Sequence, residues 1–271
     1  MQKVVIHSPG GHDRLRIEQH PDLAPGPGEV LVAVEAIGIN YADCVTRMGL
    51  YASAKHYVGF PITPGFEVAG RVAAVGPGVT DLPAGTEVMA VTRFNGYATQ
   101  IVVKRDQVFP RPAKLSVQQA AGFAAVFLTA WFALLELAHP RAGDRLLVHS
   151  AAGGVGGALV QLGRIAGCQV VGVVGASHKV DPVRQLGAIE VIDKSREDLW
   201  KAAERISRKA ITSYSTPTAS PPCSRVIATW PRSENSWCTV FTACCPAKAD
   251  APIACSCCGT TPVPRASIPS A

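Results

Sequence analysis

The chain has 271 residues, of which 48% are hydrophobic and 17% charged, and its formal net charge is +6. This length allows one large domain or two modest ones. Residues 1–207 carry 20 Lys and Arg against 18 Asp and Glu, whereas residues 208–271 carry 6 against 2, so most of the excess charge lies in the last part. That distribution, without a basic run interleaved with aromatic residues, argues against a nucleic-acid-binding protein.

The N-terminal stretch and the cysteines indicate the compartment. The first residues, MQKVVIHSPGG, lack the long apolar core of a secretory signal, and we expect a cytoplasmic protein. Only Cys44 and Cys168 precede residue 208, which excludes a disulfide framework there. The other seven cysteines lie between Cys223 and Cys258 without a pair of C-x-x-C motifs or a histidine, so we expect no metal site among them.

Residues 1–115 are predicted to form a β-rich domain. Short apolar runs of strand length, separated by Gly and Pro, occupy residues 29–39, 67–76, 86–92 and 97–103. This pattern is typical of a folded-over sheet or a small barrel. We therefore take residues 1–115 as one domain.

Residues 116–143 are predicted to be helical. Ser116 and Gln119 have the spacing of a capping box, which marks a helix start. Residues 120–138 contain one charge, Glu136, and approach the ~20 residues that a membrane span requires. The small residues before Val126 favour a helix packed inside the protein, so we do not expect membrane association.

Residues 144–193 alternate between strand and helix patterns. Strands are predicted at residues 144–150, 168–174 and 188–193, with helices at 158–167 and 178–187 between them. This order is the first half of a parallel nucleotide-binding sheet. The predicted fold class is thus α/β, with a β-rich domain followed by a nucleotide-binding domain that begins near residue 116.

A glycine turn follows the first of these strands. A pyrophosphate can approach a helix N-terminus only where no Cβ intervenes. Gly153, Gly154 and Gly156, with the backbone of Val155 between them, allow that approach, and the alternative is a tight structural turn.

The end of the second strand indicates which dinucleotide binds. An acidic residue there would bind the ribose diol of NAD, but the sequence after Gly175 offers Ser177 and Lys179 instead. A hydroxyl and a cation suit the 2′-phosphate of NADP, so we predict NADPH as the cofactor. The alternative is that Lys179 is a solvated residue at a helix start.

Four motifs carry a family resemblance over residues 2–207: GINYADCVTRMGLY, TPGFEVAGRVAAVG, LTAWFAL and HSAAGGVG. With them the chain resembles the medium-chain dehydrogenase/reductase superfamily. Within it, the zinc-free quinone oxidoreductase (zeta-crystallin-like) group is most similar, in the branch of the synaptic vesicle amine transport protein. The resemblance implies a GroES-like N-terminal domain, a Rossmann domain and a homodimer.

The resemblance also bears on metal use. Zinc-dependent relatives have a Gly-His-Glu motif and an earlier cysteine, whereas this chain has Phe66 and Asn40 at those positions. A phenyl ring offers zinc no donor, so we expect metal-free chemistry. The resemblance implies hydride transfer from NADPH to a quinone or an activated enone, because conjugation spreads the developing negative charge.

Site residues follow from the same resemblance. Asn40 and Tyr51 are expected to line the acceptor pocket, and Thr129 to touch the nicotinamide. Glu67 either orders the turn, which we favour, or transfers a proton. Tyr41 is left open between pocket and packing, and Cys44 and His149 are interpreted as core residues. A non-catalytic vesicle- or lipid-associated binding protein is the alternative function.

Residues 208–271 have a different character. They hold nine prolines and seven cysteines and sustain neither helix nor strand periodicity. If each true codon combines the third base of one residue with the first two bases of the next, residues 212–220 read IVLDANGV. From Asn235 the shifted frame reads LVVYGFHSMLPRKGG. We therefore interpret the segment as a disordered, out-of-frame tail that leaves the Rossmann domain of residues 116–207 truncated, the activity impaired and the dimer edge lost.

Overall fold

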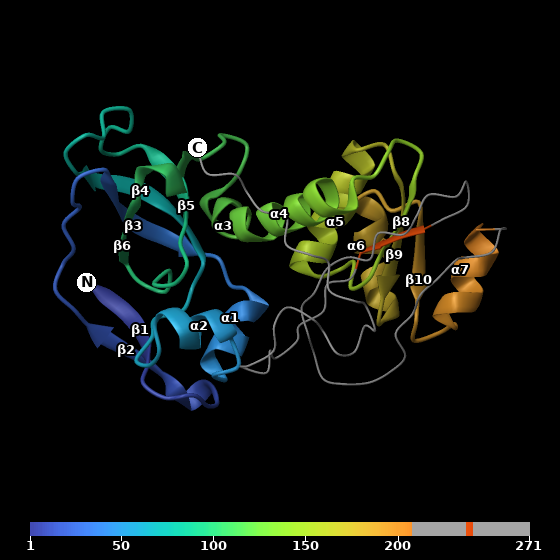
Figure 1. Cartoon of the computed structure of the whole chain (residues 1–271), viewed down its shortest axis with the longest axis horizontal. Helices are drawn as coiled ribbons and strands as arrows, with labels where there is room; N and C mark the ends of the chain where they lie inside the picture. Colours follow the sequence, from blue (N-terminus) through green and yellow to red (C-terminus); the bar gives the residue numbers. More distant parts are fainter. Residues whose placement is uncertain (208–236, 241–271) are drawn as a thin grey trace, which may run out of the picture.

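The computed structural model describes residues 1–207 and 237–240, which form two halves joined by a helical segment (Figure 1). The strands are β1 (Gln2–Ile6), β2 (Leu15–Gln19), β3 (Glu29–Ile37), β4 (Glu67–Val75), β5 (Glu87–Val91), β6 (Gln100–Lys104), β7 (Val108–Pro110), β8 (Arg145–Val148), β9 (Gln169–Val174), β10 (Glu190–Asp193) and β11 (Trp237–Val240). The helices are η1 (His12–Arg14), α1 (Tyr41–Arg47), α2 (Ala52–Tyr57), η2 (Arg105–Gln107), α3 (Val117–Ala121), α4 (Ala124–Trp131), η3 (Phe132–Ala138), α5 (Gly154–Ile165), η4 (Ser177–Lys179), α6 (Val180–Gln185) and α7 (Leu199–Ser207).

The N-terminal half is the predicted β-rich domain. Its five-stranded antiparallel sheet has the order β6-β3-β4-β5-β7, and β1 and β2 form a separate hairpin. Alternating apolar residues of β3 to β6 point to one side and bury Val30, Val32, Val68 and Val88 completely. The strand patterns of the sequence therefore correspond to real strands.

The second half is a parallel sheet with the order β10-β9-β8-β11. Leu146 and Val148 of β8 pack against α5, whereas their neighbour Leu147 faces the other way and packs with α7. Because successive side chains of a strand point to opposite faces, both faces of this sheet are covered by helices. This is the layered arrangement predicted for residues 144–193.

Two elements of this half were not predicted. Helix α7 begins where Asp198 accepts hydrogen bonds from the backbone N–H groups of Trp200 (3.0 Å) and Lys201 (2.9 Å). Strand β11 pairs with β8 in parallel, so the sheet has a fourth strand where the sequence predicted three. The rest of residues 208–271 lies outside the described residues. The interpretation of this segment as a disordered, out-of-frame tail therefore concerns residues that lie outside the described part, and so do six of its seven cysteines and the side chain of Cys238.

The segment that joins the halves differs from the single helix predicted over residues 116–143. The capping box is confirmed, since Ser116 accepts from Gln119 N (3.2 Å) and Gln119 accepts from Ser116 N (2.9 Å). However, α3 ends at Ala121 with Gly122 as its C-cap residue, α4 begins at Ala124, and the chain continues into the π-helical η3. Glycine weakens a helix interior, and Pro140 prevents continuation, which explains the break and the early end.

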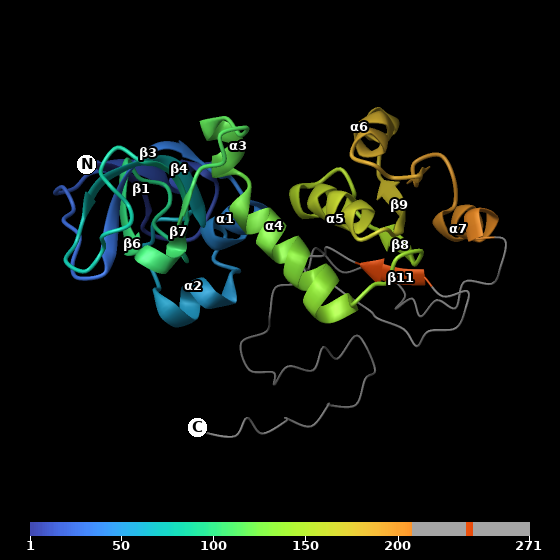
Figure 2. The same cartoon turned by 90° about the horizontal axis from the view of Figure 1, so that it is seen from above.

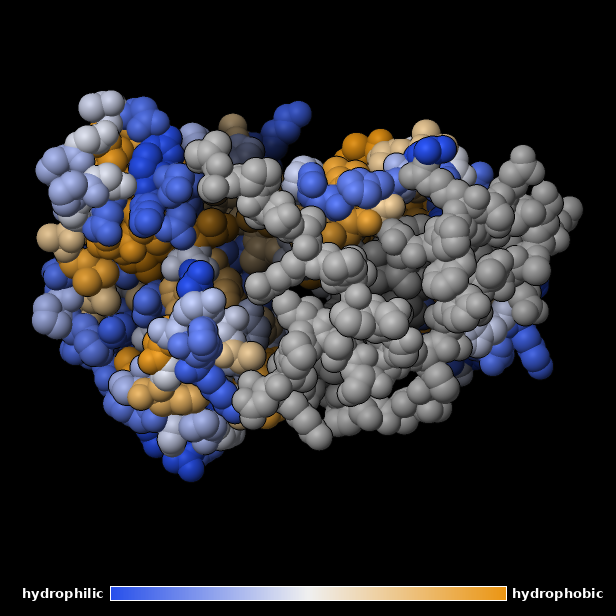
Figure 3. Space-filling model, in the orientation of Figure 1, coloured by the Kyte–Doolittle hydropathy of each residue, from blue (hydrophilic) through white to orange (hydrophobic). Residues whose placement is uncertain are grey.

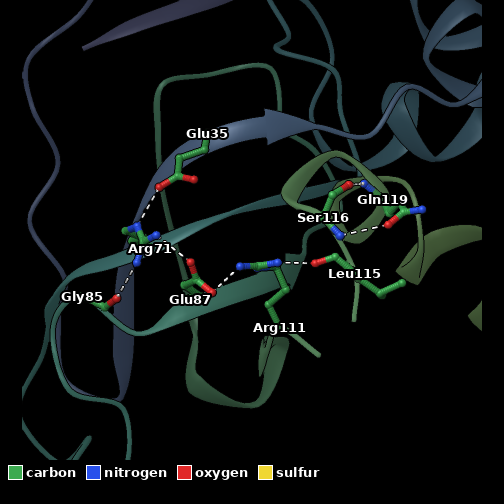
Figure 4. Close-up of polar contacts among 8 residues, drawn as sticks. All are labelled: Glu35, Arg71, Gly85, Glu87, Arg111, Leu115, Ser116 and Gln119. Atoms are coloured by element: carbon green, nitrogen blue, oxygen red, sulfur yellow. Dashed lines mark hydrogen bonds and ion pairs between the residues drawn. The ribbon is translucent and has the colours of Figure 1, made fainter. Parts of the chain in front are cut away.

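A network of ion pairs anchors α3 to the sheet (Figure 4). Arg71 on β4 bonds Glu35 (3.0 Å) and Glu87 (2.6 Å), and Arg111 bonds both Glu87 and the Leu115 carbonyl. Leu115 directly precedes the capping residue of α3. The network therefore fixes the point at which the chain leaves the β-rich domain.

Helix α4 runs from the β-rich half toward the parallel sheet, as the view from above shows (Figure 2). In α4 and the following η3, one face is buried through Ala130 of α4 and Ala133 and Leu134 of η3, but Leu128 of α4 is 54% exposed and Phe132 of η3 53%. The prediction of a helix packed inside the protein thus holds for one face only. Orange apolar surface is visible on both halves (Figure 3). Within the described residues, no helix has the length and apolarity to cross a bilayer.

Candidate functional site

The glycine turn after β8 forms a cradle at the N-terminus of α5. Gly153 is the N-cap residue, and α5 starts at Gly154, four residues earlier than the sequence predicted. Because Gly153 has no side chain, no side-chain oxygen caps the first turn, and its N–H groups keep their capacity to bind an anion. The turn starts from Ser150, whose φ of 51° lies in the left-handed region.

Close packing explains why this turn must consist of glycines. A Cβ on Gly156 would lie 2.2 Å from the Ser150 carbonyl oxygen, and a Cβ on Gly154 would lie 3.0 Å from Val126. Gly153 and Gly154 are exposed, so a ligand can reach their backbone. The residues present therefore fit a pyrophosphate on the helix N-terminus.

Helix α4 lies beside this cradle. Val126 contacts the position over Gly154, and Thr129 follows three residues later on a neighbouring part of the same helix surface. The Thr129 hydroxyl donates to the Ala125 carbonyl (2.7 Å), and the residue is exposed. Thr129 thus lies exposed on the helix that borders the glycine turn, and its contact with the nicotinamide stays a prediction.

The carboxyl end of β9 is arranged differently from the prediction. Gly175, Ser177 and Lys179 are all exposed there, but the Ser177 hydroxyl donates to Asp193 at the end of β10 (2.6 Å). Ser195 donates to the same carboxylate through Oγ (2.6 Å) and N (2.9 Å). These hydrogen bonds, that of Ser177 first, lower the pKa of Asp193. The Ser177 hydroxyl is thus already used in a hydrogen bond to Asp193. Of the two residues predicted to bind the 2′-phosphate of NADP, Lys179 is therefore the more available.

Sequence reasoning missed two charged residues at this edge. Asp193 ends β10, the neighbour of β9, and Lys194 follows it directly, with its side chain 3.5 Å from the position of a Cβ on Gly175. The sequence could have indicated these two residues. It predicts two neighbouring parallel strands, and the carboxyl ends of parallel strands meet at one edge of the sheet.

His149 lies between β8 and the cradle. Burial first, and then the nearby charge of Lys194, lower the pKa of His149 to about 4. The imidazole is therefore neutral at physiological pH, in line with its interpretation as a core residue.

On the acceptor side, Glu67 joins the two halves. Its side chain is 1% exposed, Oε1 accepts from Asn40 Nδ2 (2.8 Å), and Oε2 accepts from the backbone N–H of Ala125 in the first turn of α4 (2.7 Å). A carboxylate at a helix N-terminus is electrostatically favourable. Burial nevertheless raises the pKa of Glu67 above its usual value. The residue that the sequence assigned to turn ordering instead links Asn40 to α4.

Asp43 is a second buried carboxylate near Asn40. It accepts hydrogen bonds from the backbone of Asn40 (2.8 Å) and Gly65 (3.0 Å) and from the Tyr97 hydroxyl (3.1 Å). Burial raises the pKa of Asp43. These contacts hold the start of α1 against the turn before Phe66. They fix the backbone of Asn40, and Glu67 orients the Asn40 side-chain amide.

Phe66 packs in an aromatic cluster. Its ring centroid lies 5.6 Å from Tyr51 and 5.5 Å from Phe94, and Tyr51 meets Phe94 edge to face at 6.3 Å. Such contacts between aromatic rings stabilise the packing of this part of the β-rich half. Within the described residues, no three His, Cys, Asp or Glu side chains gather closely enough to hold a metal ion. Tyr41 is 53% exposed, and Cys44 lies half-buried on α1.

The predicted residues thus form two connected groups. Gly153, Gly154, Val155 and Gly156 form the cradle, and Thr129 lies on α4, whose Val126 borders Gly154. Tyr51 contacts Phe66, and the next residue, Glu67, receives the amide of Asn40 and the N-terminus of α4. Helix α4 therefore connects the acceptor side with the cradle.

Comparisons with known proteins agree with this architecture. The family model described as the alcohol dehydrogenase GroES-like domain matches residues 26–131. The rat synaptic vesicle membrane protein VAT-1 homolog is 36% identical over 211 residues, which cover 77% of this chain and 51% of that protein. The chain belongs to the medium-chain dehydrogenase/reductase superfamily. Its relatives put it in the zeta-crystallin-like group, in the VAT-1 branch.

Solved structures give the same result for this medium-chain dehydrogenase/reductase. Escherichia coli quinone oxidoreductase complexed with NADPH superposes with a TM-score of 0.71 at 30% identity, covering 77% of this chain and 63% of that one. CurK enoyl reductase superposes with a TM-score of 0.72 at 30% identity, covering 76% and 64%. The chain spans about half the length of the curated VAT-1 relatives it matches.

Proposed function

We propose that this chain is an NADPH-dependent, zinc-independent oxidoreductase that reduces a quinone or an activated enone. The observation that carries the proposal is the glycine cradle beside α4, where a Cβ on Gly156 would meet the Ser150 carbonyl oxygen at 2.2 Å. Structural relatives named quinone oxidoreductase and enoyl reductase support the reaction class.

The chain's own residues would bind the dinucleotide along one edge of the parallel sheet. Backbone N–H groups of the first turn of α5 would hold the pyrophosphate, and Lys179 the 2′-phosphate. The bound nicotinamide would supply a hydride. Thr129 on α4 would contact that ring, and the support is that Val126, three residues earlier on the same helix, borders Gly154.

The acceptor would lie near Asn40 and Tyr51. As a carboxylate, Glu67 can only accept hydrogen bonds, so it fixes Asn40 Nδ2 toward itself and leaves the second N–H of that amide for the oxygen on which charge develops. The aromatic cluster of Tyr51, Phe66 and Phe94 would exclude water from one side of the ring. Reduction takes up one hydride and one proton, and solvent is a sufficient proton source once the negative charge is delocalised.

Two measurements test this proposal. Titration with NADPH, followed by the enhancement of its fluorescence, should saturate, and NADH should bind at least ten-fold more weakly. NADPH oxidation should then depend on an added quinone or enone and persist after chelators remove Zn²⁺. Binding without turnover on any acceptor would favour a non-catalytic binding protein, and absence of binding would contradict the proposal as a whole.

A further inference from the structure

An exposed cationic cluster lies at the end of α2, the helix that starts beside Tyr51. The Arg93 guanidinium carbon sits 4.3 Å from the centroid of the Tyr57 ring, and the His56 ring meets Tyr57 edge to face at 4.7 Å. Tyr57 is 60% exposed, and Arg93 and His56 are exposed as well. Three residues from two separate segments therefore converge on one aromatic platform, to which we refer as the Tyr57 platform.

The charged side chains of the two segments that form this platform are all basic. The two segments that meet there, residues 44–66 and 88–105, contain no Asp or Glu. Of the four carboxylates that flank them in sequence, Asp43 and Glu67 are buried, Glu87 is paired with Arg71 and Arg111, and Asp106 is exposed in η2. Among the described residues, no carboxylate forms an ion pair with Arg93, His56 or Lys55. The charges of Arg93 and Lys55 are therefore not neutralised by an ion pair within the described residues.

The geometry of Arg93 suits an anion. A guanidinium held over an aromatic ring keeps its N–H donors in the plane and directed outward, in a fork that matches carboxylate, phosphate or sulfonate oxygens. Stacking on Tyr57 also restricts the side chain before a ligand arrives, which reduces the entropy lost on binding.

The platform is also close to the acceptor side. Phe94, which follows Arg93, contacts Tyr51 at 6.3 Å, and Tyr51 is the N-cap residue of α2. With an advance of about 1.5 Å per residue, Tyr57 lies roughly 9 Å along the helix from Tyr51. An acceptor that contacts Tyr51 can thus reach the platform with an anionic group that its ring system or a substituent holds roughly 9 Å away.

We infer that the Tyr57 platform binds an anionic group carried by the acceptor, with Arg93 as its main ligand and His56 beside it. The inference rests on the proposed function and narrows its substrate class to quinones or enones that bear a carboxylate, phosphate or sulfonate. The charge attracts such acceptors to the site, and its effect should weaken as salt screens it.

Equilibrium binding to the full chain tests the inference without turnover. The probes are anthraquinone-2-sulfonate and the neutral 2-(hydroxymethyl)anthraquinone, whose binding is followed by quenching of tryptophan fluorescence. The sulfonate should bind about five-fold more tightly at low ionic strength, which corresponds to a single exposed charge contact. The preference should shrink as NaCl is added.

Variants separate the platform from the rest of the site. Arg93→Ala should abolish the preference and leave the affinity for the neutral probe unchanged, and Arg93→Lys should keep part of the preference. Arg141→Ala removes an exposed arginine of the other half and is the matched control, with no effect expected on either probe. Circular dichroism verifies that each variant is folded.

The possible outcomes are distinct. Equal affinity for both probes, or a preference that survives Arg93→Ala, overturns the inference while the proposed function stands. Failure of both probes to bind overturns the inference together with the acceptor part of the proposed function.

Discussion

Asn40 Nδ2 donates to Glu67 Oε1 across 2.8 Å, and the other oxygen of the same carboxylate receives the N–H of Ala125 at the start of α4. One buried side chain thus orients an acceptor-side amide and anchors the helix that leads to the cradle. Glu67 directly follows Phe66, and Phe66 stands where zinc-dependent relatives have a histidine ligand. In this chain the glutamate connects two structural elements without a metal ligand beside it.

Glu67→Gln tests this connection. The glutamine can still accept from Ala125, but its NH₂ group then faces the NH₂ group of Asn40, and one of the two amides must turn over. We expect a loss of about 1–3 kcal/mol in the free energy of unfolding, because a buried charge-assisted hydrogen bond is replaced by a mismatched one. Chemical denaturation measures it. Retention of full stability would show that the bond contributes nothing.

The pH dependence of the same variant provides a second readout. Because the folded pKa of Glu67 is raised above 4.5, the native state binds a proton more tightly than the unfolded chain. The contribution of Glu67 to stability therefore falls as pH rises from about 4.5 through the folded pKa and is constant above it. The difference between wild type and Glu67→Gln should change over that window only. A difference independent of pH would mean that Glu67 titrates normally.

Gly156→Ala should disrupt the cradle. The new methyl group would lie 2.2 Å from the Ser150 carbonyl oxygen, which is backbone and cannot move away cheaply. We expect a loss of about 1–3 kcal/mol in stability and the loss of NADPH binding. Gly157→Ala is the matched control, because its methyl group would meet the flexible end of Leu186 at 3.2 Å and the Ala151 carbonyl oxygen at an ordinary contact distance of 3.7 Å. Differential scanning fluorimetry with and without NADPH compares the two, and equal behaviour would contradict the packing argument.

Phe66→His should not create a zinc site. Within the described residues the ring is surrounded by Tyr51 and Phe94, and no group of three ligating side chains is available. We expect a stability loss of about 1–3 kcal/mol from the polar ring in the aromatic cluster. Zinc content after dialysis should equal that of the wild type. Stoichiometric zinc in the variant would show that a ligand set exists.

The strands and the cradle could be predicted because their signals are local. Alternation in β3 to β6, the capping box of Ser116 and Gln119, and the glycines after β8 each depend on residues close in sequence. The exposed face of α4 could not be predicted, since the hydropathy of Leu128 does not tell which side of a helix is covered. The contacts between Ser177 and Asp193 and between Arg93 and Tyr57 could not be predicted either, because they depend on which segments become neighbours in space.

The Ser177 contact leads to a prediction about cofactor preference. Since Ser177 already donates to Asp193, Ser177→Ala should change NADPH affinity less than two-fold, whereas Lys179→Ala should weaken it about ten-fold by removing a charge-assisted contact. Neither change should affect NADH, which lacks the 2′-phosphate. Fluorescence titrations with both dinucleotides measure this. A larger effect of Ser177→Ala would show that the hydroxyl turns from Asp193 to the phosphate.

The last prediction concerns the reading frame after Ser207. If residues 208–271 result from translation in the wrong reading frame, the coding DNA read in the shifted frame should encode IVLDANGV and, further on, LVVYGFHSMLPRKGG. The chain spans 51% of its rat VAT-1 relative, so further in-frame sequence has a counterpart there. A protein made in the shifted frame from codon 208 should bind NADPH at least ten-fold more tightly than the 271-residue chain, because a completed parallel sheet encloses the ligand at its carboxyl edge. Sequencing across codon 207 and paired NADPH titrations test both parts. Stop codons in the shifted frame, or equal affinity of the two proteins, would refute the interpretation.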